Sequence, residues 1–268
     1  MYILYSAVAL IFIAPLLYIS VSSLKPDLQI VSDMSSIKGF LPYGDLSLSN
    51  YLSVIQKMDF FKYFRNSAIS TILTVIFGTL INAMLGYSLG MLEFKGKKLI
   101  LSLMIAMMII PTEAVIINRM LIAFHLKMLD TMTVLVVPAL AYPMYVFLFY
   151  SHFKGMPKEL MQAAVIDGAS YEMIFTRIMF PLSQPVIATV AIMTFIRRWG
   201  ELLWPTLVTR TDRFRTLPQA MRSLFTNSYV YWGEIFAYGV MVTIPTVIIF
   251  LLFQKPFIQS IAMTGIKG

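Results

Sequence analysis

Long apolar stretches alternate with short polar ones along this chain, and the apolar stretches are long enough to cross a bilayer. A membrane-spanning helix needs about 17–25 mostly apolar residues. Six stretches reach that length: 2–24, 66–92, 99–122, 131–151, 178–200 and 235–254. The pattern predicts an all-α membrane protein with six transmembrane helices in a single domain, residues 1–268.

Composition agrees with this prediction. Charged residues make up 13% of the chain, whereas ordinary soluble domains are about one quarter charged. Six spans leave little room for a soluble catalytic domain. The first stretch has neither a basic leader nor a small-residue cleavage site before Lys25, so it is interpreted as a span and not as a secretory signal.

Several kinds of chemistry are absent from the sequence. With no cysteine and two histidines, we expect no metal site. No G-x-x-x-x-G-K-[ST] phosphate loop occurs, so the chain needs a partner to use ATP. No nucleophile–base set is apparent, so we expect neither an enzyme nor a cofactor. The net charge of +8 suits contact with anionic lipid better than nucleic acid, because the basic residues do not cluster on one soluble face.

The orientation in the membrane follows from the loops. An even number of spans puts both termini on one side. The compact basic cluster Lys95, Lys97 and Lys98 lies on that same side, which favours cytoplasmic termini, although basic residues also occur in the opposite loops.

A polar segment, residues 154–177, joins the fourth and fifth spans and predicts a short helical hairpin. Pro157 suits a first helical turn, Asp167-Gly168 suits a helix end, and Ser170 suits the cap of the next helix. Apolar residues at helical spacing predict one apolar face: Leu160, Met161, Ala164 and Val165. From the pattern alone, the hairpin either joins two spans or presents a docking surface, and small residues at 163, 164 and 169 favour close approach by another protein.

The hairpin also carries an ordered set of residues at fixed spacing: Pro157, Glu159, Leu160, Ala163, Ala164, Asp167, Gly168, Ala169 and Phe175, then Pro181-Leu182 and Pro185. This set resembles the EAA loop of ABC importer permeases. Three further stretches resemble the MalG-like subfamily of carbohydrate importers: Trp199–Pro205, Thr216-Leu217-Pro218, and the ending from Phe257 to Gly268. The resemblance covers nearly all of the chain after about residue 50.

The resemblance implies a type I importer permease fold in a bacterial inner membrane. It implies as partners a second, MalF-like permease subunit, a dimer of ATP-binding cassette ATPases, an extracellular solute-binding protein and a saccharide. The first hairpin helix would be a cytoplasmic coupling helix that contacts the ATPase. The residues implied in that contact are Glu159, Gln162, Ala163, Ala164, Asp167, Gly168 and Ala169.

The sequence departs from the family pattern at three places. Gln162 stands where the loop usually has the glutamate that names it, and Gly200 replaces an asparagine. Residues 116–120 read I-I-N-R-M in place of I-I-P-L-Y. A neutral Gln162 would make a hydrogen bond where the family makes a salt bridge.

Polar and charged residues within or beside the spans give a hypothesis for the translocation pathway. They are Asn118, Arg119, Arg197, Arg198, Trp199 and Glu201. Ionisable groups at membrane depth usually face a cavity or a partner, and arginine suits a carboxylate. These residues therefore predict an acidic, uronate-containing saccharide. In the alternative, Arg197 or Arg198 pairs with Glu201 while Arg119 extends to the interface.

Other functions stay open at this point. The same architecture also suits the import of a polyol or a glycerol phosphate. A self-contained secondary transporter is less favoured, since it predicts paired broken-helix repeats and intramembrane carboxylates. Gly86-x-x-x-Gly90 predicts close helix contact, either within the chain or with another permease.

Overall fold

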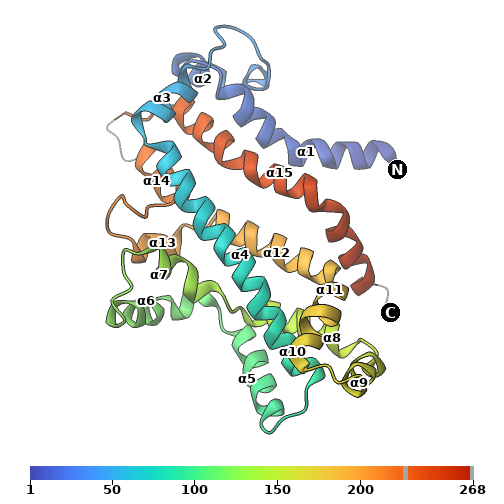
Figure 1. The fold of residues 1–268 in the computed structure, drawn as a ribbon. Helices are drawn as coiled ribbons and strands as arrows, with labels where there is room; N and C mark the ends of the chain where they lie inside the picture. The colour runs from blue at the N-terminus through green and yellow to red at the C-terminus, as the bar shows by residue number, and fades with distance from the viewer. Residues whose placement is uncertain (226–228, 266–268) are drawn as a thin grey trace. The chain divides into compact units, whose positions relative to one another are not determined.

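The computed structural model describes residues 1–225 and 229–265, so the end of the predicted tail motif, 266–268, lies outside the described residues. The described residues form helices joined by loops and contain no β-strand, as predicted (Figure 1). They pack into two compact units. The first comprises Met1–Ser67 with Arg215–Ile248, and the second comprises Ala68–Phe214 with the chain from Ile249.

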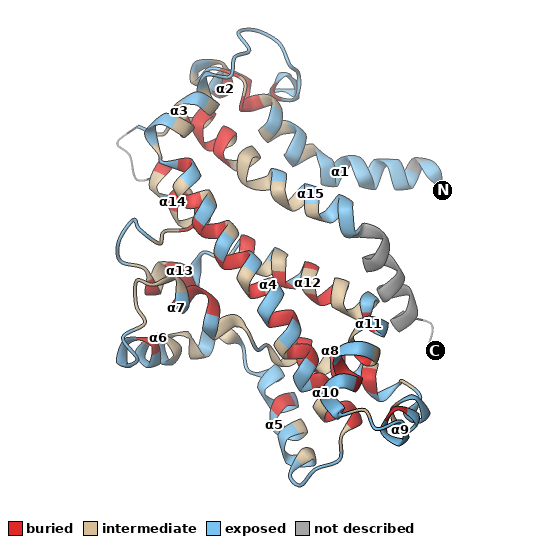
Figure 2. Cartoon of the chain, viewed as in Figure 1, coloured by how far each residue is buried: buried red, intermediate tan, exposed pale blue. Residues whose placement is uncertain are grey.

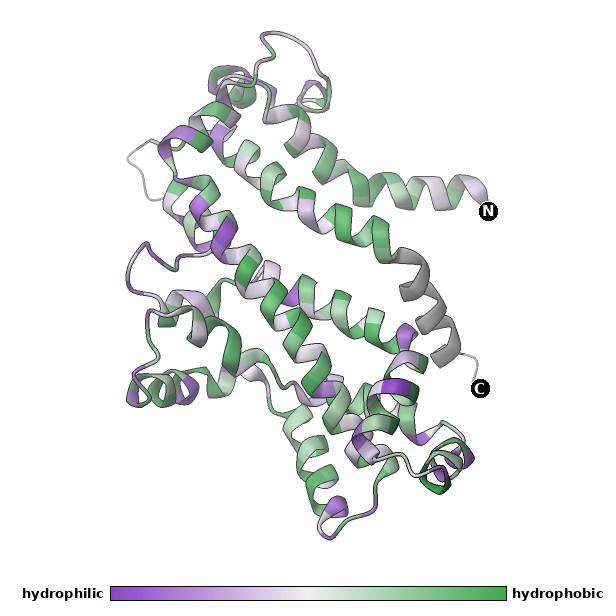
Figure 3. Ribbon diagram, in the orientation of Figure 1, coloured by the Kyte–Doolittle hydropathy of each residue, from purple (hydrophilic) through white to green (hydrophobic). Residues whose placement is uncertain are grey.

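Among the described residues, three continuous helices are long and apolar enough to cross a membrane: α1 (Tyr2–Ser22), α4 (Phe60–Met91) and α15 (Trp232–Gly265). Helix α4 begins before the predicted residue 66. Apolar residues dominate these helices (Figure 3). Most residues of α1 are exposed (Figure 2), and none of its apolar window is buried, although the helix is partly covered towards its end at Ser22. An apolar helix left open in this way suits lipid or another membrane helix.

The other three predicted spans are bent pairs of helices, so the described chain has six spans only if each pair crosses as one. The first pair bends by 99° near Pro111, the second by 42° between Pro138 and Pro143, and the third by 80° near Ser183. A proline removes one helical hydrogen bond and clashes with the preceding turn, which explains why the breaks occur near prolines.

The bent pairs and their connections make up most of the second unit. Its elements beyond α4 are α5 (Lys97–Ile109), η2 (Thr112–Val115), α6 (Ile116–His125), α7 (Met132–Val136), η3 (Val137–Ala139), α8 (Pro143–Lys154), α9 (Lys158–Ile166), α10 (Tyr171–Ile174), the π-helical turn η4 (Phe175–Met179), α11 (Phe180–Leu182), α12 (Gln184–Trp199) and α13 (Leu203–Val208).

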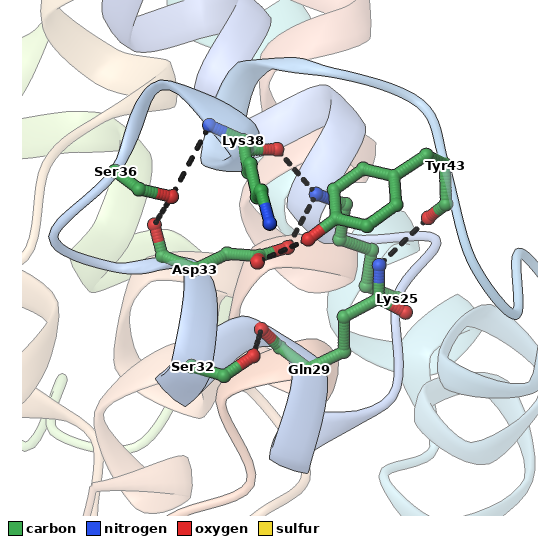
Figure 4. A network of polar contacts seen from close by, with 7 residues as sticks. All are labelled: Lys25, Gln29, Ser32, Asp33, Ser36, Lys38 and Tyr43. Atoms are coloured by element: carbon green, nitrogen blue, oxygen red, sulfur yellow. Dashed lines mark hydrogen bonds and ion pairs between the residues drawn. The ribbon is translucent and has the colours of Figure 1, made fainter.

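In the first unit, the polar insert after α1 folds around a buried lysine. It contains α2 (Asp27–Asp33), η1 (Ile37–Phe40) and α3 (Ser49–Lys57), and the same unit holds α14 (Leu217–Leu224). Figure 4 shows Lys25 Nζ donating to Asp33 Oδ2 at 3.0 Å and to the Lys38 carbonyl at 2.8 Å. Tyr43 donates its hydroxyl hydrogen to Asp33 Oδ1. The Tyr43 hydrogen bond, aided by Lys25 and opposed by desolvation, holds the pKa of Asp33 below its ordinary value of 3.8.

Within the second unit, the Gly86-x-x-x-Gly90 pattern packs against α8. A Cβ at Gly86 would lie 2.8 Å from the Tyr150 backbone nitrogen and closer still to the Phe149 Cβ. A Cβ at Gly90 would lie 3.0 Å from the Phe153 Cβ. The helix contact that the sequence left open is therefore one within this chain.

The break between η3 and α8 leaves backbone groups without helical hydrogen-bond partners, and Asn82 of α4 provides a partner for two of these groups. Asn82 donates to the Leu140 carbonyl at 2.9 Å and accepts from the Tyr142 N–H at 2.9 Å. Asn82 is 1% exposed. Because irregular backbone at membrane depth is tolerated only where its polar groups are satisfied, this asparagine allows the break to lie inside the unit.

Candidate functional site

The hairpin between α8 and α12 has the geometry that the sequence predicts. Helix α9 ends at Ile166, and Gly168 has a φ of +83°. The Ala169 N–H donates to the Ala164 carbonyl at 2.9 Å, and the Gly168 N–H donates to the Val165 carbonyl at 3.0 Å. These two bonds define a Schellman motif, which needs the left-handed conformation that glycine adopts without strain.

The next helix begins as predicted. The Ser170 hydroxyl accepts from the Met173 N–H at 3.3 Å, and Glu172 lies in the first turn, where a carboxylate suits the helix dipole. The chain thus reverses direction within a few residues, and both helix ends are satisfied locally.

The apolar residues of α9 divide between the core of the unit and its surface. Ala164 is buried and Met161 packs beside it, whereas Leu160 and Val165 are each more than 40% exposed. Ile166 is 85% exposed. The hairpin therefore has an inner side, packed on the unit, and an outer side that leaves branched aliphatic groups open.

The inner side joins the main core of the second unit. Ala164 belongs to a buried cluster with residues of α4, α8, α10, η4 and α12, and these are Ala83, Tyr87, Met91, Tyr145, Phe149, Phe153, Ile174, Phe175, Met179 and Val190. The Tyr87 hydroxyl also donates to the Tyr171 carbonyl, at 3.3 Å. A displacement of the hairpin must therefore move side chains that also pack the spanning helices.

Most of the other residues expected to contact the ATPase are exposed, and these are Glu159, Gln162, Ala163, Asp167 and Gly168. Ala169 is half-buried and packs against the same core as Ala164. A Cβ placed on Gly168 would have no atom within 4 Å. The structure thus brings this set together on one small element.

A second candidate site is a cavity of about 420 Å³ at the bends of the first two helix pairs and the end of α12. Its polar lining consists of Thr112, Arg119, Tyr142, Tyr145, Thr194, Arg197, Arg198 and Glu201. Binding pockets for small molecules typically have volumes of about 300–1,000 Å³. The cavity is therefore large enough for a sugar unit.

Two of the arginines support the broken segment around η3. Arg198 pairs with Glu201 and donates to the Leu135 carbonyl at 2.6 Å. Arg119 donates to the Pro138 carbonyl at 3.1 Å, and its guanidinium carbon lies 4.7 Å from the centre of the Trp204 ring. The pairing of Arg198 with Glu201 agrees with the structural alternative raised by their spacing.

Trp204 completes this support. Pro138 has no N–H to donate to the Val134 carbonyl four residues earlier, and the indole Nε1–H of Trp204 donates to that carbonyl at 2.9 Å. Trp204 is 1% exposed. Three carbonyls of the α7–η3 segment thus accept hydrogen bonds from side chains of other helices.

Arg197 contacts a different set of residues. Its guanidinium carbon is 3.9 Å from the centre of the Tyr142 ring, and it donates to the Thr112 hydroxyl at 3.4 Å. The two remaining pathway candidates do not line the cavity. Asn118 is exposed elsewhere on α6, and Trp199 is buried with its ring stacked on Phe195.

Sequence reasoning missed the uncharged part of the cavity lining: Thr112, Tyr142, Tyr145 and Thr194. Each of the first two adjoins a proline at a break, Pro111 and Pro143. A polar side chain beside a proline in an apolar stretch is the signal that would have identified Thr112 and Tyr142, because residues next to the break of a span can face a cavity.

The sequence pattern of one protein family matches residues 82–262, and its description is "Binding-protein-dependent transport system inner membrane component". The chain is 31% identical to the arabinooligosaccharides transport system permease protein AraQ of Halalkalibacterium halodurans, over 98% of this chain and 94% of that protein. It is also 31% identical to the trehalose/maltose transport system permease protein MalG of Thermococcus litoralis, over 83% of this chain and 82% of that protein.

A solved structure shares the fold. It is a chain in the crystal structure of a bacterial ABC transporter involved in the import of the acidic polysaccharide alginate. The TM-score is 0.84 at 22% sequence identity, with 96% of this chain and 94% of that chain covered. The arrangement of bent and continuous helices is therefore that of an importer permease.

Proposed function

We propose that this chain is one transmembrane subunit of an ATP-driven saccharide importer. The chain belongs to the family of inner membrane components of binding-protein-dependent transport systems. Relatives over most of its length are named for arabinooligosaccharides and for trehalose and maltose. These names support a saccharide over a polyol or a glycerol phosphate. The chain would form half of the pathway, and a second, MalF-like permease subunit would form the other half.

In this proposal residues 1–268 form a single permease domain with six spans, and each bent pair crosses the bilayer as one span. Both termini then lie in the cytoplasm, together with the hairpin and the Lys95–Lys98 turn. The polar insert after α1 and the loop after α13 face outward, where an extracellular solute-binding protein delivers the saccharide.

The hairpin is the proposed contact with the ATPase dimer, which supplies the energy. The observation that carries this assignment is the exposed aliphatic surface of α9, with Ile166 85% exposed. Outside the bilayer such a surface is in contact with water unless a partner covers it. Because Ala164 of the same helix packs in the main core, movement of a bound ATPase would reach the spanning helices.

Replacing Ile166 by serine tests the contact without disturbing the fold, because this side chain packs on little of its own chain. Leu28, also 85% exposed, lies on α2 in the polar insert and provides the matched control. We expect Ile166→Ser to lower copurification of the ATPase about tenfold, as loss of a buried aliphatic anchor would. Leu28→Ser should leave copurification unchanged. Equal ATPase recovery with both variants would contradict the proposed contact.

The energy source separates this function from a secondary transporter. In proteoliposomes that contain the importer with its binding protein, saccharide uptake should require internal ATP and persist when ion gradients are collapsed. Uptake that follows an ion gradient and ignores ATP would overturn the proposal.

A further inference from the structure

The cavity between the bent helices carries more positive than negative charge. Arg119, Arg197 and Arg198 line it, against the single carboxylate of Glu201. Glu113 and Arg197 both border an adjoining cavity of about 490 Å³, and they form no ion pair within the described residues. The three guanidinium groups carry like charges around one cavity, so an anion among them would reduce their mutual repulsion.

Only one of the three arginines has its charge compensated by the chain. Arg198 is paired with Glu201, and its side chain is 7% exposed. Arg119 and Arg197 have no acidic partner among the described residues. Charged groups at this depth are costly and usually face a partner of opposite charge. These two cations are therefore available to an anion that enters the cavity.

Most N–H donors of the two arginines make no hydrogen bond within the described residues. Each guanidinium carbon lies over an aromatic ring, that of Arg197 at 3.9 Å from the centre of Tyr142 and that of Arg119 at 4.7 Å from the centre of Trp204. A guanidinium has five N–H donors. Arg119 gives one to the Pro138 carbonyl, and Arg197 gives one to Thr112 and also interacts with Tyr145.

The rest of the lining suits a sugar. Tyr142 and Tyr145 provide aromatic surface, and Thr112 and Thr194 provide hydroxyl groups beside it. We infer that the transported saccharide is acidic, and that its carboxylate pairs with Arg197 and Arg119 while its ring lies against Tyr142 and Tyr145. Arg198 is excluded from this role because Glu201 already compensates its charge. The inference rests on the proposed import function and adds the charge of the substrate.

The test uses the complete importer, this chain with its own partners, in proteoliposomes loaded with ATP. Uptake is measured for a panel of uronate-containing di- and trisaccharides and for their methyl esters, which lack the negative charge and add one methyl group. Neutral sugars of the same linkage and sugar phosphates complete the panel. We expect the carboxylates to enter faster than their esters, and faster than sugar phosphates of the same size.

Substitutions then locate the preference. Arg197→Gln should lower the ratio of carboxylate to ester uptake about tenfold, as loss of a charge-assisted hydrogen bond predicts. Arg197→Lys keeps the charge without the planar fork and should lower the ratio less, and Arg119→Gln should act in the same direction as Arg197→Gln. Arg210→Gln removes a cation from an exposed loop of the same unit and should leave the ratio unchanged. The binding protein is identical throughout, so its own selectivity cancels in these comparisons.

The outcomes separate the inference from the function on which it rests. If esters and neutral sugars enter as fast as carboxylates, or if Arg197→Gln slows all of them equally, the inference is wrong and the importer assignment stands. A preference for sugar phosphates that depends on Arg197 would overturn the carboxylate assignment. If no saccharide shows ATP-dependent uptake, both proposals fail. Extraction of the intact complex in detergent checks that each variant assembles. If Arg197→Gln does not assemble, the comparison is made with Arg197→Lys and Arg119→Gln instead.

Discussion

Replacing Gly86 by alanine is predicted to weaken the contact between α4 and α8. The added Cβ would meet the Tyr150 nitrogen at 2.8 Å and the Phe149 carbonyl carbon at 2.9 Å. Both are backbone atoms, so no side-chain rotation relieves the clash. Overpacking typically costs about 1–3 kcal/mol, and the better helix propensity of alanine returns about 1 kcal/mol. Contacts below 3.0 Å with three atoms place Gly86→Ala at the upper end of the overpacking range, so the expected net loss in the free energy of unfolding is about 2 kcal/mol.

Two other glycines provide comparisons for this predicted loss in the free energy of unfolding. At Gly90 the Cβ would lie 3.0 Å from the Phe153 Cβ and 3.2 Å from the nearest backbone atoms, so Gly90→Ala should change stability by less than about 0.5 kcal/mol. At Gly200 the nearest atom would be 3.8 Å away, and alanine should not destabilise the chain.

The assay is unfolding of the purified chain in mixed micelles by increasing sodium dodecyl sulfate, followed by tryptophan fluorescence. The predicted order of stability places Gly86→Ala lowest, with Gly90→Ala and Gly200→Ala near the wild type. A Gly86→Ala protein as stable as the wild type would refute the reasoning, because it would mean that the two backbones separate at no cost.

Three further substitutions test other contacts. The folded-state pKa of Asp33 lies below 3.8, so its stabilising effect is present above about pH 3.8 and is lost as the pH falls through the folded value; limited proteolysis of the insert should increase in that acid range, and Asp33→Asn should abolish this response. Asn82→Leu leaves the Tyr142 N–H without its partner and should cost about 1–3 kcal/mol in the same unfolding assay. Trp204→Phe removes the indole donor but keeps a ring, so a similar loss is expected, and an unchanged midpoint would show that the hydrogen bond is unimportant.

The sequence allowed the fold to be predicted where local rules act alone. Apolar length placed the continuous helices, and Gly168 and Ser170 predicted the hairpin's end and restart correctly, since a left-handed residue and an N-cap act through their nearest neighbours. The extent of bending was not predicted. Prolines mark a possible break, but an angle of 99° depends on which distant side chains satisfy the freed backbone groups.

The residues that line the cavity were likewise predicted only in part. Its arginines were identified because charge within an apolar stretch is unusual, and the spacing of Arg198 and Glu201 suggested their pairing. The tyrosines and threonines beside them were missed, because such residues are common in membrane helices and only folding brings them together. Asn118 was included for its polarity and its position beside Arg119, yet its place on α6 keeps it out of the cavity lining.

The α7–η3 segment owes its position to three separate side chains, since Trp204, Arg198 and Arg119 each hold one of its carbonyls. A carbonyl inside a continuous helix is held by a cooperative ladder of backbone hydrogen bonds. Each of these three carbonyls instead depends on one side chain, and the three side chains come from different helices. Loss of one donor would therefore free one point of the segment and leave the other two points bonded.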